Sequence, residues 1–361
     1  MWMMLFMVLP ILALVYIGWH IWAILPFTPL WKSLIIIVLL LCFSLLFFSI
    51  MRKFDTMPLP VSQAMYEIGT SSIMILLYLV MTFLVLDLGR LVHIVPKPLL
   101  YHNWQMSLGI FVFIFAIFLY GNIHYKNKVR VPLELKSSKP LAKDYRIVML
   151  SDLHVGYHNT RKELDRWVDM INAENPDFIL IAGDIIDGSM RPLQEERMIE
   201  EFHRLKAPVY ACLGNHEYYA GNPEAQQFYK DAGIRLLIDS VVQIDSCITV
   251  IGRDDRTNMR RKQLKDYSVD KKSYTIVLDH QPYNLDRAEA AGVDFQLSGH
   301  THRGQVWPIS WITDRIYECS WGSHHRGNTQ YYVSSGIGIW GGKFRIGTQS
   351  EYIVAELRSG E

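Results

Sequence analysis

Four long apolar runs fill the first 125 residues and constrain the fold of this chain more than any other feature. Their approximate ranges are 3–25, 33–50, 68–86 and 104–121. Each is close to the roughly 18–20 residues that an α-helix needs to cross a bilayer. Hydrocarbon offers no hydrogen-bonding partner to backbone amides and carbonyls, so such runs must be helical. We therefore predict an N-terminal transmembrane region of four helices over residues 1–125.

The charges beside these runs predict the orientation in the membrane. No basic segment precedes the first run and three more runs follow, so we expect a retained helix and not a cleaved signal peptide. Four spans place one group of basic residues on the side of the C-terminal half: Arg52, Lys53, Lys126, Lys128 and Arg130. The other side has Lys32, Lys97 and Arg90. The positive-inside rule then predicts a multi-pass cell-membrane protein with a cytoplasmic C-terminal domain.

Two ionisable residues lie at the end of the third run. Asp87 and Arg90 are three residues apart, on one face of the expected helix. We interpret them as an ion pair at the membrane interface, with Arg90 reaching toward the headgroups, and not as an intramembrane site.

Composition changes after the last run. Residues 126–144 are rich in lysine and contain two prolines, which predicts a linker along charged headgroups. The chain as a whole has 36 basic and 35 acidic residues, a net charge of +1 that gives no reason to expect a nucleic-acid partner. The four cysteines show no paired spacing and leave the redox compartment open.

From residue 145 to 361, short apolar runs alternate with helical stretches and predict a separate α/β domain. Thr160 followed by Glu163 is a capping box that opens a helix, and a second helix is expected near 193–205. Strand–helix–strand units come first and hairpin-like strands follow, which predicts packed sheets with helices outside. The expected strands are 146–150, 178–182, 209–213, 241–244, 248–251, 274–278, 295–297, 331–333 and 352–357.

Polar side chains follow five of these strands at the point where each strand ends. Ligands of α/β sheets collect at the carboxyl ends of strands, so we expect these residues to share one cleft. They are Asp152 and His154, then Asp184 and Asp187, then Asn215 and His216, then His280, and finally His300 and His302.

Carboxylate, imidazole and amide ligands without thiolates suit Mn, Fe or Zn in a hydrolytic site. One carboxylate can bridge two cations about 3.5–4 Å apart, and a water between them becomes a nucleophile near neutral pH. The same cations neutralise a phosphoryl group. A lone Asp-x-His is common in proteins that bind no metal, but five such motifs in order favour a site for two divalent cations.

These motifs resemble the signature of the calcineurin-like metallophosphoesterases. The matching residues are Asp152-Leu153-His154, Gly183-Asp184-Ile185-Ile186-Asp187, Gly214-Asn215-His216-Glu217, His280 and Gly299-His300-Thr301-His302. The opening Ser-Asp-Leu-His and the runs 299–305 and 334–338 are similar to those of membrane-associated bacterial members and their transmembrane animal relatives. The resemblance implies a four-layer α-β-β-α sandwich of two central sheets flanked by helices.

The resemblance also implies a role for each residue of the site. Asp152, His154 and His302 would hold the first metal, and Asn215, His280 and His300 the second, with Asp184 bridging the two. His216 would act as general acid or transition-state donor, with Asp187 accepting a hydrogen bond from it. Arg303 would either reach a substrate phosphate or point to solvent, and Arg345 is a second candidate for binding phosphate. Gly188 stands where the protein phosphatases of this family have arginine, which counts against a phosphoprotein substrate.

The function that these features predict is metal-dependent hydrolysis of a phosphodiester or pyrophosphate bond, in a membrane-associated substrate such as a lipid. Four spans exceed what tethering requires. Four aromatic residues after the last motif would either form an apolar lip toward the bilayer or pack inside a loop: Trp307, Trp311, Tyr317 and Trp321. The alternatives are a tethered nucleotide or phosphomonoester phosphatase and a metal-binding membrane sensor or assembly protein. The presence of both His216 and Asp187 disfavours the sensor, and the sequence predicts no oligomeric state.

Overall fold

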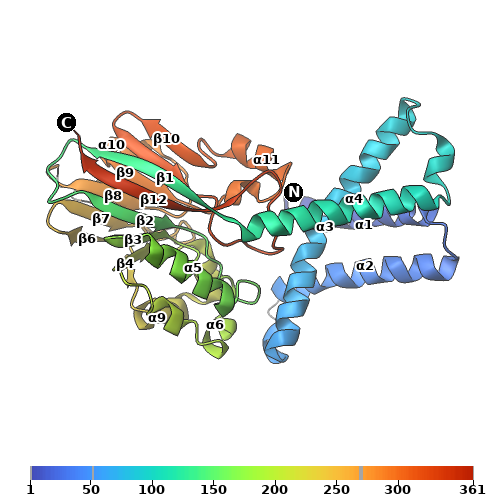
Figure 1. Cartoon of the computed structure of the whole chain (residues 1–361), viewed down its shortest axis with the longest axis horizontal. Helices are drawn as coiled ribbons and strands as arrows, with labels where there is room; N and C mark the ends of the chain where they lie inside the picture. The colour runs from blue at the N-terminus through green and yellow to red at the C-terminus, as the bar shows by residue number, and fades with distance from the viewer. Residues whose placement is uncertain (1, 51–52, 268–270, 361) are drawn as a thin grey trace. The chain divides into compact units, whose positions relative to one another are not determined.

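The computed structural model describes residues 2–50, 53–267 and 271–360 of the chain. It contains two compact units (Figure 1). The first, the helical unit, comprises residues 1–123 and the short segment 341–344. The second, the sandwich unit, comprises residues 124–340 and 345–361.

All four predicted apolar runs are helices: α1 (Trp2–Ile24), α2 (Pro29–Ile50), α3 (Leu59–Leu91) and α4 (Trp104–Lys126). Single 3₁₀ turns, η1 (Lys53–Thr56) and η2 (Lys97–Leu100), lie in two of the connections. Among the described residues, three helices are long and apolar enough to cross a membrane, namely α2, α3 and α4. The corresponding part of α1 is the shorter apolar helix Val8–Ile24. The prediction of four helices is confirmed. Among the described residues, three of the four are long and apolar enough to cross a membrane.

Asp87 has different partners from the one we predicted. Its Oδ2 accepts a hydrogen bond from the Tyr16 hydroxyl at 2.6 Å and lies 3.1 Å from His20 Nε2. Both partners belong to α1, and His20 also stacks on Phe83 with ring centroids 4.5 Å apart. No ion pair joins Asp87 to Arg90 within the described part of the chain. Packing of α1 against α3 brings these donors to Asp87, which helical spacing within α3 alone does not reveal.

Two six-stranded sheets form the sandwich unit. Across the first sheet the strands are β1 (Lys128–Ser137), β12 (Ser350–Ser359), β2 (Tyr145–Leu150), β3 (Phe178–Ala182), β4 (Val209–Cys212) and β5 (Arg235–Leu236). Across the second they are β10 (Gly322–Arg326), β11 (Thr329–Val333), β9 (Phe295–Ser298), β8 (Tyr274–Leu278), β7 (Ile248–Gly252) and β6 (Ser240–Ile244). Neighbours from β2 to β5 run parallel, as do those from β7 through β8 and β9 to β11. The sheets are mixed because β2 is antiparallel to β12, β6 to β7 and β10 to β11.

The period of two along a strand sends alternate side chains to opposite faces and builds four layers. In β2, Ile147 and Met149 enter the core between the two sheets, where Val250 and Ile276 meet them. Val148 of the same strand faces an outer core formed with helices. A further core covers the outer face of the second sheet. The predicted α-β-β-α sandwich is confirmed.

Short helices cover the outer faces and fill the connections. They are α5 (Arg161–Ala173), α6 (Arg191–Glu195), α7 (Ile199–Phe202), α8 (Asn215–Ala220), α9 (Asn222–Asp231), α10 (Asp286–Ala290) and α11 (Ile309–Ile316), with 3₁₀ turns η3 (Leu264–Asp266) and η4 (His302–Gly304). The capping box that opens α5 is confirmed, with the Thr160 amide donating to Glu163 Oε2 at 2.9 Å. The helix expected over 193–205 is divided into α6 and α7, because Arg197 adopts a left-handed φ of 54° between them.

The segment 126–144, predicted as a linker, contributes a full strand. Residues Lys128–Ser137 form β1 at the edge of the first sheet, paired in parallel with β12. Leu133 and Leu135 are buried while Glu134 and Lys136 between them are exposed, as a half-buried strand requires. Pro132 has no backbone N–H to donate, and it is tolerated because an edge strand has a hydrogen-bonded neighbour on one side only. The lysines indicated a linker, but Lys128 and Lys136 occupy outward positions of the alternating pattern of β1.

Candidate metal centre

The parallel order of the central strands brings the predicted polar residues to one end of the sandwich. Asp152 and His154 follow β2, Asp184 follows β3, and Asn215 follows β4. From the second sheet, His280 follows β8 and the 300–302 loop follows β9. Among the described residues, three groups could each hold a metal ion, and the ligand atoms within a group all lie within 4.8 Å of one another. The groups are Asp152, His154 and His302; His154, Asp184 and His216; and Asp184, His280 and His300.

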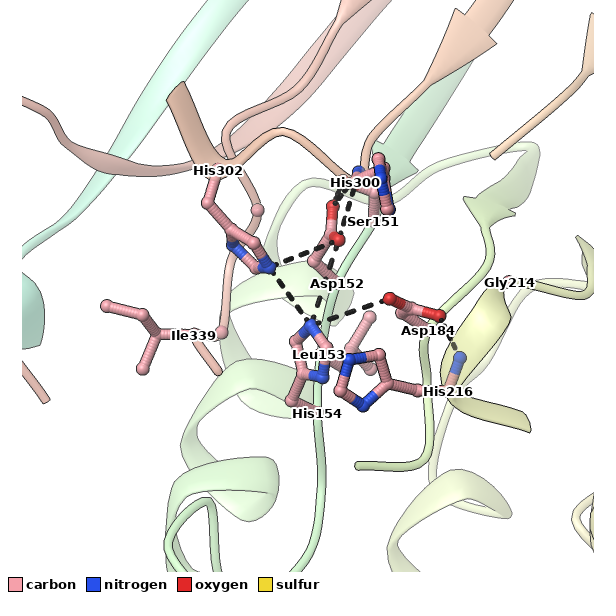
Figure 2. A network of polar contacts seen from close by, with 12 residues as sticks. Ser151, Asp152, Leu153, His154, Asp184, Gly214, His216, His300, His302 and Ile339 are labelled. Atoms are coloured by element: carbon pink, nitrogen blue, oxygen red, sulfur yellow. Dashed lines mark hydrogen bonds and ion pairs between the residues drawn. The ribbon is translucent and has the colours of Figure 1, made fainter. Parts of the chain in front are cut away.

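His154 lies between its neighbours at the centre of Figure 2. Its Nε2 is 3.1 Å from His302 Nε2, 3.7 Å from Asp184 Oδ2 and 3.8 Å from Asp152 Oδ1. His302 Nε2 is also 3.4 Å from Asp152 Oδ1. These distances place the predicted ligands of the first cation around one point.

The second group meets the first at Asp184. Asp184 Oδ2 lies 3.0 Å from His280 Nε2, so this one carboxylate oxygen lies near ligand atoms of both groups. His280 Nδ1 hydrogen-bonds to the Ala182 carbonyl at 2.7 Å, which directs its Nε2 toward Asp184. Its ring lies 5.2 Å from that of His300. Asp184 thus stands where a bridging ligand would be required.

The chemistry of these side chains fits divalent cations. Asn215 Oδ1 is buried and accepts no hydrogen bond from the residues described here, although buried amide oxygens are almost always paired. Burial lowers the pKa of His300 to about 4 and that of His302 to about 3, so both imidazoles are neutral at pH 7, as metal ligation demands. Burial would raise the pKa of Asp184, but His280 and His216 hold it well below its usual range. Burial would lower the pKa of His154 and of His280, but Asp152 and Asp187 raise that of His154 to about 10, and Asp184 raises that of His280 well above its usual value. Divalent cations would replace the protons on these two rings, so the buried imidazoles and ionised carboxylates together are a donor set for cations.

Strained backbone conformations and glycine residues allow the ligand-bearing loops to approach one another this closely. Asp152, Asp184 and His302 have left-handed φ values of 53°, 52° and 46°, which cost on the order of 1–3 kcal/mol each. A Cβ at Gly214 would lie 2.1 Å from Asp184 Oδ1, and one at Gly299 would lie 2.3 Å from Asp152 Oδ2. The glycines of both motifs are therefore required for the carboxylates to enter the cluster.

Glu217 holds two ligand loops together, a role that the sequence reasoning missed. Its buried carboxylate accepts the amides of Gly214 at 2.7 Å, Asp184 at 3.1 Å and Ile186 at 3.0 Å, and the Tyr229 hydroxyl at 2.9 Å. Burial raises the pKa of this carboxyl while the backbone amides lower it. The available signal was an acidic residue directly after His216, at the third position of a helix.

Asp187 lies beside His216 as predicted, but its backbone makes the hydrogen bond. His216 Nδ1 donates to the Asp187 carbonyl, and the Asp187 carboxylate is 3.5 Å from the same nitrogen. That carboxylate is closer to His154 Nδ1, at 3.3 Å. Burial would raise the pKa of Asp187, but His154 and other imidazoles lower it to about 2. Asp187 is thus positioned to orient the rings of both histidines.

The two arginines predicted to bind substrate differ in their surroundings. Arg345 is fully buried and donates to the carbonyls of His302 at 2.7 Å and Ser335 at 2.5 Å. It also donates to Ser350 Oγ at 3.1 Å. A guanidinium used in this way has no face for a phosphate, so its position corrects our expectation: Arg345 fixes the His302 loop. Arg303 is half-buried, with its guanidinium 4.2 Å above the Trp321 ring, and remains a candidate.

Ligands of this kind are used by hydrolases that depend on divalent metal ions, and the sandwich unit falls in that class. The family described as calcineurin-like phosphoesterase matches residues 145–304, which include every predicted ligand. The metallophosphoesterase Cj0846 of Campylobacter jejuni is 31% identical over 259 residues, 68% of each chain. A metallophosphoesterase of Aquifex aeolicus is 29% identical over 232 residues, 61% of this chain and 87% of that protein. The chain belongs to the calcineurin-like metallophosphoesterase family.

Relatives with membrane segments are also found. A zebrafish (Danio rerio) protein described as a transmembrane protein with metallophosphoesterase domain is 30% identical over 226 residues. The match covers 57% of this chain and 51% of the zebrafish protein. The chain thus spans about half the length of the zebrafish protein. It covers 60% of a metallophosphoesterase of Helicobacter pylori.

Replacing Asp184 should remove metal from the site. Asn has the shape of Asp but no charge, and a bridging position depends on an ionised carboxylate. We expect Asp184→Asn to bind at most one divalent ion per chain, against two for the wild type, measured by elemental analysis after dialysis against Mn²⁺. Asp286→Asn, at an exposed position of α10, is the control and should bind two. Equal metal content in Asp184→Asn and wild type would contradict the bridging role.

Proposed function

We propose that this chain hydrolyses phosphodiester or pyrophosphate bonds in a membrane-associated, lipid-like substrate. The observation that carries the proposal is the buried Asp184 carboxylate, which two groups of imidazole and carboxylate ligands share. Such an arrangement is suited to two cations acting on one phosphoryl group.

Asp152, His154 and His302 would hold one cation and Asn215, His280 and His300 the other, with Asp184 common to both. When bound, two Mn, Fe or Zn ions would draw charge from the phosphoryl oxygens and lower the pKa of a water. Side chains of the protein would supply the remaining step, which is proton transfer to the leaving oxygen.

His216 is the candidate for protonating the leaving oxygen. Its Nδ1 is engaged by the Asp187 carbonyl, so its Nε2 is the nitrogen available for proton transfer. Burial lowers the pKa of His216, with Asp184 opposing, so its imidazolium is a stronger acid than that of an exposed histidine. A phosphate group arriving nearby favours the protonated ring. His216 then gives its Nε2 proton to the oxygen that departs.

An exposed apolar helix supports a substrate at a membrane surface. Helix α11 follows the 300–302 loop by a few residues and exposes Trp311 (65%), Ile312 (57%) and Ile316 (59%). Trp307 lies against Trp311, with ring centroids 5.3 Å apart. Clustered exposed apolar side chains of this size mark binding surfaces, and tryptophan favours the headgroup region. Trp307 and Trp311 therefore support the apolar lip. Tyr317 and Trp321 pack within the sandwich unit instead, where Tyr317 hydrogen-bonds to Tyr283 and Trp321 donates to Glu351.

His216→Ala should separate catalysis from metal binding. We expect kcat for bis(p-nitrophenyl) phosphate with Mn²⁺ to fall about 10²–10⁴-fold, the usual contribution of general acid–base catalysis, while metal content stays near two ions per chain. His325→Ala, on the exposed edge of β10, should behave as wild type. Unchanged hydrolysis in His216→Ala would disprove the assigned role.

Polar substitution on α11 should reduce activity toward lipid more than toward a soluble ester. We expect the double variant Trp311→Ser and Ile312→Ser to lower the ratio of phosphatidylglycerol to bis(p-nitrophenyl) phosphate hydrolysis at least tenfold, since full burial of even one such side chain contributes roughly 1.5–3 kcal/mol. Met259→Ser, at a side chain 91% exposed, is the matched control. An unaltered ratio in the double variant would remove the support for a lipid surface.

The membrane orientation is proposed on charge alone. We place the sandwich unit in the cytoplasm on the basic residues that flank the spans. Of these, Arg52 lies outside the described residues. A reporter that is active only in the cytoplasm, fused after Glu361, should be active. Activity of a periplasmic reporter at the same position would reverse the orientation.

A further inference from the structure

A loop that contributes no metal ligand is tightly bound beside the site. The 253–261 loop follows β7, and Arg253 and Arg261 both pair with Asp279, at 2.5 and 2.8 Å. Asp279 directly precedes His280. The buried Asp255 accepts the side-chain amide of Gln281, the residue after His280, at 2.8 Å. The loop is therefore fixed to the strand end that presents a ligand.

The same loop is also fixed to the helix that carries Asn215 and His216. Tyr218, in α8, donates its hydroxyl to both carboxylate oxygens of Asp254, at 2.8 and 2.9 Å. Asn258 donates to Asp254 as well, at 2.8 Å. Anchored on two sides, the loop holds a rigid position at the rim of the site.

Arg256 differs from Arg253 and Arg261 of the same loop, which both pair with Asp279. Its neighbours Asp254 and Asp255 are occupied by the contacts above, and no ion pair joins Arg256 to any described carboxylate. Its Nη1 is buried and meets no acceptor within the described ranges. The guanidinium carbon lies 3.9 Å above the Tyr283 ring, a stacked arrangement that fixes the plane of the group. A buried donor without an acceptor is unfavourable, and a bound anion would supply the missing acceptor.

A short aromatic path leads from this guanidinium to the metal ligands. The hydroxyls of Tyr283 and Tyr317 are 3.1 Å apart and their ring centroids 4.8 Å apart. Tyr317 lies 6.4 Å, centroid to centroid, from His300. Arg256 therefore stands on the His280–His300 side of the site, with the rings of Tyr283 and Tyr317 between its guanidinium and His300.

We propose that Arg256 forms an anion subsite that binds the second, non-scissile phosphate of a diphosphate-containing substrate. The inference rests on the proposed function and narrows it from phosphodiesters in general to pyrophosphate-type substrates. A planar guanidinium held on an aromatic ring can donate two parallel hydrogen bonds to a phosphate with little further loss of side-chain freedom. A simple diester has no second phosphate for this group.

Direct binding provides the test, because it does not depend on turnover. Calorimetric titration of the full chain in detergent, at a fixed free Mn²⁺ concentration, would compare pyrophosphate with orthophosphate. We expect Arg256→Gln to lower the ratio of pyrophosphate to orthophosphate affinity at least tenfold, as loss of a charge-assisted hydrogen bond predicts. Arg256→Lys keeps the charge but lacks the planar guanidinium, so its affinity ratio should lie between those of the wild type and Arg256→Gln.

Arg260→Gln, an exposed arginine of the same loop, is the matched control and should keep the wild-type ratio. Thermal unfolding of each variant checks that the fold is retained, and Arg256→Lys provides the test if Arg256→Gln unfolds. An unchanged ratio in a folded Arg256 variant would overturn the subsite and leave the hydrolase intact. A wild type that binds pyrophosphate through Arg256 but cleaves no phosphoester would instead overturn the proposed function.

Discussion

The burial of Asp184 among imidazoles is the constraint on which the rest of the sandwich unit depends. Removing a carboxylate from water is costly unless opposite charge or donors replace the water. Here the carboxylate accepts the His216 amide at 2.9 Å and faces His280 and His154. The two sheets must therefore bring their strand ends to one place, since His280 comes from the second sheet and Asp184 from the first.

The surroundings of this carboxylate show where stability is given up for a site. Left-handed backbone at ligand positions and glycines packed against carboxylates are unfavourable for an isolated chain. Buried charges hold them in place: Glu217 gathers the amides of two loops, and Arg345 gathers carbonyls from the 302 and 335 loops. Such a network stabilises only when every member is satisfied, so these residues matter as much to the site as the ligands do.

Polar and apolar features of the site edge both support the proposed substrate. Arg303 and Arg256 each place a guanidinium over an aromatic ring, while α11 exposes tryptophan and isoleucine. Phosphate groups and an apolar tail are the two chemistries that such an edge would recognise together. A lipid diphosphate contains both, and this links the anion subsite to the proposed lipid substrate.

Local patterns in the sequence determined a large part of this protein. Hydrophobic period and length predicted helices α1 to α4 and most strands, and the capping box placed the start of α5. Strand-end positions predicted that Asp152, Asp184 and His280 meet, because parallel strands align their carboxyl ends. These features depend on neighbours within a few residues or on one rule of sheet geometry.

Tertiary structure alone decided the contacts between distant segments. It turned the lysine-rich 126–144 segment into edge strand β1, because β12, more than 200 residues later, supplies its partner. It paired Asp87 with α1 and buried Arg345 against carbonyls. It also stacked Arg256 on Tyr283, with no acceptor for its Nη1 among the described residues. The sequence shows that a charged residue is present, but its partner is set by which chain segments pack together. For this protein the sequence predicted the candidate ligands, and only the fold showed which charged side chains surround them and which have no partner among the described residues.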